Sequence, residues 1–347
     1  MTLSLIPQNS STELRPKNEA LTIMGEVASQ AAALSVFDRY HQEQALATIK
    51  RHGHSLKIFG RFIQTAADEF DIDVESVDFQ NDPAAWSPVT WGLAQAFKTW
   101  LLNEGYAIGT VNKRIDALRV YASMASQAGF VSADELLKIK MVRSIPHKTA
   151  KNVNESRSKQ RVSTKKAEAT RIDFALANIL KVSHEESPAG RRNALIMALL
   201  LDHGMRASEV VLLTLDSFDF EAEELIFYRP KTGDQTRHKL TVATAGAAAD
   251  FKDEMAPAGA IFLGNYKDGR LQNKPLNRFT LSKKITRLGK RFGIDSLSPH
   301  DCRHYCATEM AGREYGIKEL MDWFGWTSPA MAVRYIEAAI VQERNKG

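Results

Sequence analysis

Four residues near the carboxyl end of the sequence have side chains suited to chemistry on a phosphodiester. His300 and Arg303 are three residues apart, so a helix would present both on one face. Trp326 lies further on, and Tyr335 follows it by nine residues. An imidazole, a guanidinium, an indole and a phenol that converge in a basic protein indicate a phosphodiester target. Such a site still needs a second arginine, a proton donor for the leaving group and a surface that holds nucleic acid.

A helix is expected to begin immediately before His300. Ser298 is a favourable N-cap, Pro299 suits the first helical turn, and Asp301 completes a Ser-x-x-Asp capping box. The alternating residues His300, Cys302, His304 and Cys306 superficially resemble metal ligands. On a helix, however, residues two apart point about 200° away from each other, so these four cannot converge on one ion. We therefore predict no metal site.

Two residues earlier in the chain can complete the phosphodiester site. Gly204 is expected to end a helix over residues 190–203, which places Arg206 at a junction with the next helix. Glu209, three residues on, could hold the guanidinium of Arg206. Lys231 falls in a turn between two predicted strands. Taken alone, an arginine at a helix end and a lysine in a turn are usually just exposed.

The composition describes a soluble globular protein with a mild preference for polyanions. The chain has 347 residues, 44% of them hydrophobic and 25% charged, with a formal net charge of +5. This length predicts two domains. The two cysteines exclude a disulfide framework and fit a reducing cytoplasm. No run is long and apolar enough to span a membrane, and residues 1–24 lack a signal-peptide pattern and are predicted to be a flexible leader.

The first half has helical periodicity and no catalytic pattern. Apolar residues recur at helical spacing over 34–53, from Ser55 onward, over 90–104 and from Gly109 onward, which predicts a helical domain over residues 25–145. Residues 146–170 are basic and poor in apolar side chains, as in a linker, and a second domain is expected over 171–347. Basic residues in three predicted helices could contact DNA, although such residues often only face solvent. These candidates are Lys57, Arg61, Lys113, Arg114, Arg119, Lys283, Lys284 and Arg287.

The second half resembles the catalytic domain of tyrosine recombinases, the phage integrase family, and the first half more weakly resembles their core-binding domain. Five pieces agree in order: Gly204-Met-Arg-Ala-Ser-Glu209, Lys231-Thr-Gly, His300-Asp-Cys-Arg-His304, Gly325-Trp326, and Tyr335. The resemblance implies a mainly α fold with a small β-sheet, in which a helical core-binding domain and an α+β catalytic domain form a C-shaped clamp on DNA.

The resemblance also implies a role for each site residue. Arg206 and Arg303 would bind the scissile phosphate and stabilise the transition state, so that neither a metal nor ATP nor any cofactor is required. Tyr335 would form a 3′-phosphotyrosine bond and release a 5′-hydroxyl. Lys231 would protonate the leaving oxygen, and His300 would assist as an acid–base or hydrogen-bonding group near Tyr335. Glu209 and His304 would support them.

The sequence departs from the family pattern at two positions. Trp326 stands where many members have histidine, and in this it is similar to Cre-type recombinases. An indole can donate a hydrogen bond and support the tyrosine helix, but it cannot shuttle a proton. Cys302 occupies a position that is usually apolar, and we expect it only to pack. Tyr305 and Tyr315 are rival phenols, of which Tyr305 is expected to lie in the core.

The resemblance predicts site-specific recombination of double-stranded DNA, as in integration or excision of a mobile element. A type IB topoisomerase-like activity or a catalytically silent DNA-binding protein are the alternatives. The resemblance implies a tetramer on two DNA sites, with accessory DNA-bending or directionality factors as candidate further partners. It also implies a DNA-associated cytoplasmic protein of a bacterium, archaeon, phage or plasmid. Ile336, Ala339 and Ile340 give the tail an apolar stripe that could dock on a neighbouring subunit or on its own domain.

Overall fold

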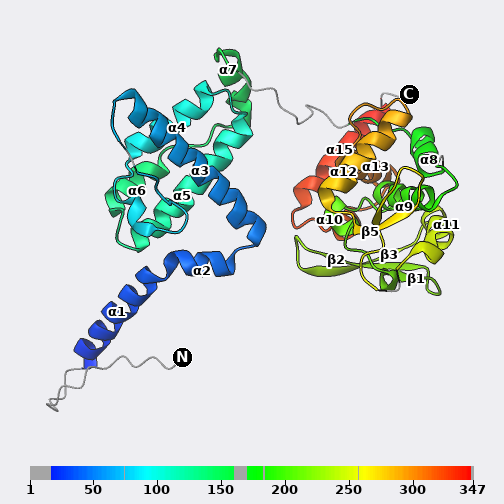
Figure 1. Cartoon of the computed structure of the whole chain (residues 1–347), viewed down its shortest axis with the longest axis horizontal. Coiled ribbons are helices and arrows are strands. Elements are labelled where there is room, and N and C mark those ends of the chain that lie inside the picture. The colour runs from blue at the N-terminus through cyan, green and yellow to red at the C-terminus, as the bar shows by residue number, and fades with distance from the viewer. Residues whose placement is uncertain (1–16, 74, 160–169, 183, 257, 345–347) are drawn as a thin grey trace. The chain divides into compact units, whose positions relative to one another are not determined.

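The computed structural model describes residues 17–73, 75–159, 170–182, 184–256 and 258–344, in two compact units. The first unit comprises residues 1–165 and the second residues 166–347, so the division falls within the range predicted for the basic linker. Figure 1 shows a first unit built from helices and a second unit in which helices pack with small sheets. The mainly α fold with a small β component is confirmed.

The first unit contains seven α-helices and two short 3-10 helices within the described residues. They are α1 (Lys17–Leu34), α2 (Val36–Glu43), α3 (Leu46–Glu69), η1 (Pro83–Trp86), α4 (Trp91–Asn103), α5 (Ile108–Gln127), α6 (Ala133–Lys140), η2 (His147–Thr149) and α7 (Ala150–Glu155). Aromatic residues fill the core between α3, η1, α4 and α5: the Phe59 ring lies 5.1 Å from that of Phe97 and 6.3 Å from that of Trp86. The Trp86 indole donates to the Phe79 carbonyl at 2.9 Å, which satisfies its one buried polar atom.

One helix boundary predicted for this unit was wrong. The chain breaks between α2 and α3 at Gln44 and Ala45, whereas Gly53 lies inside α3 and does not end a helix. The glycine at this position serves packing and not helix termination, since the side chain of Gln80 occupies the space that a Cβ at Gly53 would fill. In addition, α1 begins at Lys17, within the range predicted to be a flexible leader.

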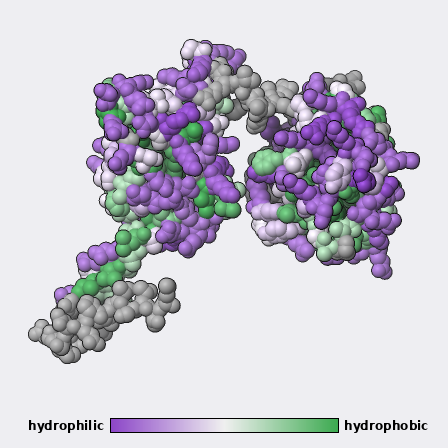
Figure 2. Space-filling view, viewed as in Figure 1, coloured by the Kyte–Doolittle hydropathy of each residue, from purple (hydrophilic) through white to green (hydrophobic). Residues whose placement is uncertain are grey.

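Helix α1 exposes apolar side chains, among them Leu21, Met24 and Leu34. Figure 2 shows this hydrophobic stretch along α1, whereas the visible faces of both units are otherwise largely hydrophilic. No described helix is by itself both long and apolar enough to cross a membrane; α1 and α2 meet that test only as a pair bent by 62°.

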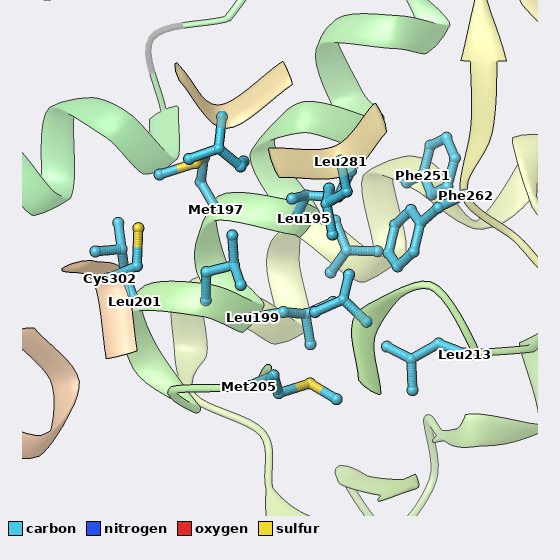
Figure 3. Close-up of a cluster of buried hydrophobic side chains, with 14 of the residues drawn as sticks. Leu195, Met197, Leu199, Leu201, Met205, Leu213, Phe251, Phe262, Leu281 and Cys302 are labelled. Atoms are coloured by element: carbon cyan, nitrogen blue, oxygen red, sulfur yellow. The ribbon is translucent and has the colours of Figure 1, made fainter. Parts of the chain in front are cut away.

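The second unit surrounds one buried helix. Its helices are α8 (Phe174–Val182), α9 (Pro188–Asp202), α10 (Ala207–Val210), α11 (Val242–Phe251), α12 (Arg278–Arg291), α13 (Pro299–Gly312), α14 (Ile317–Phe324) and α15 (Pro329–Arg344), with 3-10 turns η3 (Leu215–Ser217) and η4 (Lys252–Glu254). Helix α9 packs against α8, α11 and α13. Leu195, Leu199 and Leu201 of α9 are at most 1% exposed and meet Phe251 of α11 and Leu281 of α12 in one core (Figure 3).

Two small antiparallel sheets complete the second unit. Strands β1 (Phe218–Asp219), β2 (Glu224–Arg229) and β3 (Asp234–Lys239) form a sheet in that order, and the β2–β3 register pairs Leu225 with His238. The predicted hairpin around Lys231 is therefore present. A second hairpin of β4 (Leu263–Asn265) and β5 (Leu271–Pro275) was not predicted.

Three aromatic rings connect the β2–β3 hairpin to α9 and α14. The His238 ring stacks on Trp323 at 3.8 Å between centroids, and the His203 ring lies 5.5 Å from that of His238. Both histidines are at most 2% exposed. Burial lowers the pKa of His203 to about 4 and that of His238 to about 2, so both are neutral near pH 7.

These two histidines predict that acid destabilises the second unit. Below the ordinary histidine pKa of about 6.5, the unfolded chain binds protons that the folded chain does not, so the free energy of unfolding falls as the pH decreases. We expect a loss of roughly 1 kcal/mol per pH unit per histidine between about pH 6.5 and 4, measured by urea unfolding. His203→Gln should reduce this dependence on pH, and an unchanged dependence would contradict our assignment.

Candidate active site

Arg303 on α13 lies at the centre of the predicted site. Ser298 caps this helix as predicted, since its hydroxyl accepts from the Asp301 amide at 3.3 Å while the Asp301 carboxylate accepts from the Ser298 amide at 2.8 Å. The Arg303 guanidinium is 6% exposed and donates to the carbonyls of Gly204 at 2.7 Å and Phe324 at 2.6 Å. Burial, reinforced by neighbouring arginines, lowers its pKa to about 10, so it stays charged at neutral pH.

Arg206 is held beside Arg303 by a turn and a carboxylate. Gly204 has a left-handed φ of +59°, and a Cβ there would collide with the Phe324 ring. The turn delivers Arg206 to the N-cap of α10, where Glu209 accepts from its backbone amide at 2.8 Å and from its guanidinium at 2.6 Å. Glu209 is 1% exposed while the Arg206 side chain is 23% exposed, so the arginine keeps an accessible face.

The two arginines line a cavity of about 280 Å³. His300 contributes to the same wall, and the remaining lining residues are Ala207, Ser282, Ser298 and Pro299. Two guanidiniums and an imidazole around a cavity of this size suit an anion such as a phosphate group. The carboxylate of Glu209 is not among the lining residues, so it does not oppose an anion from the cavity wall.

Tyr335 on α15 contacts a histidine pair on α13. Its hydroxyl lies 2.5 Å from Nδ1 of His304, and Nε2 of His304 lies 3.1 Å from Nε2 of His300. Burial lowers the pKa of His304, with the neighbouring His300 adding to the effect, so the ring is neutral near pH 7. The chain Tyr335–His304–His300 therefore leads from the phenol towards the cavity that His300 lines.

The ring of Trp326 supports the ring of Tyr335. The two rings are parallel within 2° and their centroids are 5.4 Å apart. The Phe324 ring also stacks on Trp326, at 4.7 Å between centroids. Tyr335 is 7% exposed, and this burial raises its pKa to about 12 in spite of the opposing charges of Arg303 and Arg334. The phenol is consequently protonated at neutral pH and needs a proton acceptor before it can attack.

Lys231 is not brought together with the other predicted site residues. It is exposed in the turn between β2 and β3, it does not line the arginine cavity, and no hydrogen bond or ion pair joins it to another residue in the part of the chain that the structure describes. The nearby residue that does reach the site is Arg229, which was not predicted. Its guanidinium is 3.7 Å from the Glu209 carboxylate. The available signal was an arginine at an inward-facing position of the strand, in line with the buried Leu225 and Phe227.

The rival groups of the sequence face elsewhere. Tyr305 is half-buried against the core around α9, and Tyr315 is 40% exposed beyond α13. Cys302 belongs to that same core, whereas Cys306 packs with Phe324 and Ala332. On α13, therefore, the two cysteines point away from the His300–His304 pair, as the helical spacing predicted.

The predicted DNA-contacting residues differ in exposure. Lys57, Arg61, Lys113, Lys283 and Arg287 are exposed. Arg119 is paired with Asp116 at 3.1 Å. Arg114 is buried 3.9 Å from the centre of the Tyr106 ring, and Lys284 is half-buried and donates to Asn265 at 2.7 Å. Burial lowers the pKa of Lys284 to about 8. Arg114 is thus packed inside the first unit, whereas Lys284 is hydrogen-bonded within the second unit, and contact of any of these residues with DNA stays a prediction.

Comparisons with known proteins agree on one family. Residues 173–340 match the family described as "Phage integrase family". The tyrosine recombinase XerC of Corynebacterium glutamicum is 24% identical over 246 residues, which cover 67% of this chain and 69% of XerC.

Two solved structures share the fold. The Tn1549 transposon integrase in complex with transposon right end DNA has a TM-score of 0.60 at 15% identity and covers 91% of this chain and 99% of that one. A lambda integrase dimer bound to a core site has a TM-score of 0.58 at 16% identity, with coverage of 87% and 94%.

Proposed function

Since this chain belongs to the phage integrase family of tyrosine recombinases, we propose that Tyr335 is the nucleophile with which it cuts and rejoins DNA. The chain is a site-specific DNA recombinase, and neither topoisomerase-like relaxation nor silent DNA binding is favoured by the comparisons. The observation that carries the assignment of Tyr335 is its 2.5 Å contact with His304, beside a cavity lined by Arg206 and Arg303.

In the proposed reaction, the phenolic oxygen of Tyr335 attacks phosphorus while its proton passes to Nδ1 of His304. The P–O5′ bond breaks, a 3′-phosphotyrosine bond forms, and Lys231 gives a proton to the leaving 5′-oxygen. Arg206 and Arg303 bind the non-bridging oxygens, whose negative charge grows in the transition state. The 5′-hydroxyl of another strand can then reverse the same steps. Because the covalent bond conserves the energy of the phosphodiester, these steps consume no ATP.

His304 takes a more direct part in this scheme than the sequence suggested. His300 was the expected acid–base partner of Tyr335, with His304 as support. The contact of the Tyr335 hydroxyl with Nδ1 supports His304 as the acceptor and His300 as its hydrogen-bonding partner at 3.1 Å. With Nδ1 accepting, Nε2 of His304 carries the proton and donates to Nε2 of His300. Each imidazole thus orients the next.

Tyr335→Phe is expected to abolish covalent trapping on DNA. The substrate is a duplex with the recombination site, identified by mapping recombination junctions, and nicked so that the released fragment diffuses away. Wild-type protein should accumulate a denaturant-resistant adduct on gels. Tyr305→Phe and Tyr315→Phe serve as matched controls and should retain it. An adduct with Tyr335→Phe would show that another residue is the nucleophile.

His304→Ala is expected to slow single-turnover cleavage by about 10²–10³-fold, within the range for loss of a general base. Because the pKa of His304 is lowered, the wild-type rate should be level near neutral pH and decrease only below the ordinary histidine pKa, as the imidazole becomes protonated. The variant should lose this decrease and instead speed up in alkali, as Tyr335 begins to ionise. A variant with the wild-type rate and pH profile would exclude His304 as the acceptor.

DNA is the partner of this recombinase, and we propose that several copies assemble on two sites. The residues of the predicted apolar stripe of the tail differ in burial. Ile336 and Ala339 pack within the second unit, whereas Ile340 is 44% exposed on α15. Ile340 is therefore the described residue of the stripe that can support docking on a neighbour.

Ile340→Glu is expected to weaken assembly on two-site DNA while single-site binding is retained, measured by sedimentation of the complexes. A charge at the centre of an apolar contact is costly to bury. Ala338→Glu adds the same charge at an exposed position on another face of α15 and should leave assembly intact. Equal assembly by both variants would exclude docking through Ile340.

A further inference from the structure

Arg229 ends strand β2 with its charge inside the protein. Its side chain is 2% exposed, and burying a charge is costly unless partners surround it. Nε donates to the Thr236 hydroxyl of β3 at 2.6 Å, and Nη2 donates to the carbonyl of Trp323 at the end of α14. Nη1 lies 3.7 Å from Oε1 of Glu209 on α10. One guanidinium thereby joins three elements that meet at the active site.

The first connection leads to Arg206. Oε1 of Glu209 lies between two guanidiniums, at 2.6 Å from Arg206 and 3.7 Å from Arg229. Arg229 is the more buried of the pair, so it fixes the carboxylate from the interior while Arg206 keeps its accessible face towards the cavity. A carboxylate shared in this way also leaves Arg206 with uncompensated positive charge for a phosphate.

The second connection leads to Trp326 and Tyr335. Arg229 and Arg303 cap successive carbonyls, those of Trp323 and Phe324, at the end of α14. Gly325 follows with a left-handed φ of +56°, and a Cβ there would lie 2.9 Å from Cδ of Arg229. The stem of Arg229 therefore packs on the turn from which Trp326 reaches the Tyr335 ring.

We infer that Arg229 is a positioning residue for strand cleavage, which acts through Glu209 on Arg206 and through the end of α14 on Trp326. This inference rests on the proposed function of the site. In this role Arg229 supports phosphate binding and the nucleophile. It does not act through Lys231, the proposed donor to the leaving oxygen, although Lys231 is only two residues away. The hairpin tip contacts the backbone of Arg229, since the amides of Thr232 and Gly233 donate to its carbonyl.

Arg229→Met is expected to slow single-turnover cleavage by about 100-fold at saturating protein, because displacements of about 1 Å in an active site have effects of that size. Arg229→Lys keeps the charge but not the fork of donors, so we expect roughly a tenfold loss. DNA affinity should be unchanged for both. Arg237→Met is the matched control: Arg237 lies on the same hairpin, is 63% exposed and pairs with Glu224, so its loss should not slow cleavage.

A substrate with sulfur in place of the bridging 5′-oxygen separates the two possible routes, since a thiolate leaves without protonation. Lys231→Ala should be slow on the oxygen ester and recover on the sulfur substrate. Arg229→Met should be slowed, relative to wild type, to the same extent on the oxygen ester and on the sulfur substrate. Recovery of Arg229→Met on the sulfur substrate would show that it acts through Lys231 and would overturn the inference.

Wild-type rates in both Arg229 variants, or a rate loss that follows the loss of DNA affinity, would overturn the inference. If Arg229→Met does not fold, as judged by circular dichroism, the rates of Arg229→Lys on the two substrates provide the same test. Absence of an adduct with wild-type protein would instead contradict the proposed function itself.

Discussion

The architecture of the site depends on three neighbouring arginines, two of which share one buried carboxylate. Arg206, Arg229 and Arg303 carry like charges into a small region. Burial disfavours the charged forms of Arg229 and Arg303; the charge of Arg206 adds to this effect for both, and that of Arg229 adds to it for Arg303. Glu209 compensates only part of this charge. The remaining positive charge is oriented by carbonyls and packing, so it persists when DNA is absent. A phosphate that enters the cavity supplies the missing negative charge without any need to reorganise the site, which is how preorganised electrostatics lower a barrier.

Two turns make this arrangement sterically possible. Gly204 and Gly325 both have left-handed φ values, and each lies against a side chain of the site: Phe324 in the first case and Arg229 in the second. The carbonyl of Gly204 and the carbonyl of Phe324, the residue before Gly325, both accept hydrogen bonds from Arg303. Side chains larger than hydrogen at these turns would separate α10, α13 and α14, and with them the arginines proposed to bind the phosphate. The glycines of the two sequence motifs thus permit the close packing that holds the residues of the site together.

The proposed nucleophile, Tyr335, is held in its protonated form at neutral pH. Burial under Trp326 raises the pKa of Tyr335 to about 12, which keeps the phenol from ionising on its own. The adjacent neutral imidazole of His304 supplies an acceptor at contact distance. Since Trp326 has no proton to exchange at neutral pH, it serves as a support for the ring, and in the proposed reaction the proton transfer is assigned to the two histidines of α13.

Much of this second unit could be predicted from the sequence, because the features concerned depend on residues that are close together in the chain. The Ser298 cap, the hairpin around Lys231, the Arg206–Glu209 pair and the separation of cysteines from histidines on α13 all follow from spacing within one turn or one element. Other features do not follow from such spacing. They are the burial of Arg114, the half-buried position of Lys284, the continuation of α3 through Gly53, and the contacts of His304 and Arg229. Helical spacing tells which face a residue occupies, but not which distant element covers that face. His304 meets Tyr335 across 31 residues and Arg229 meets Trp323 across 94, so those contacts arise only when the chain has packed.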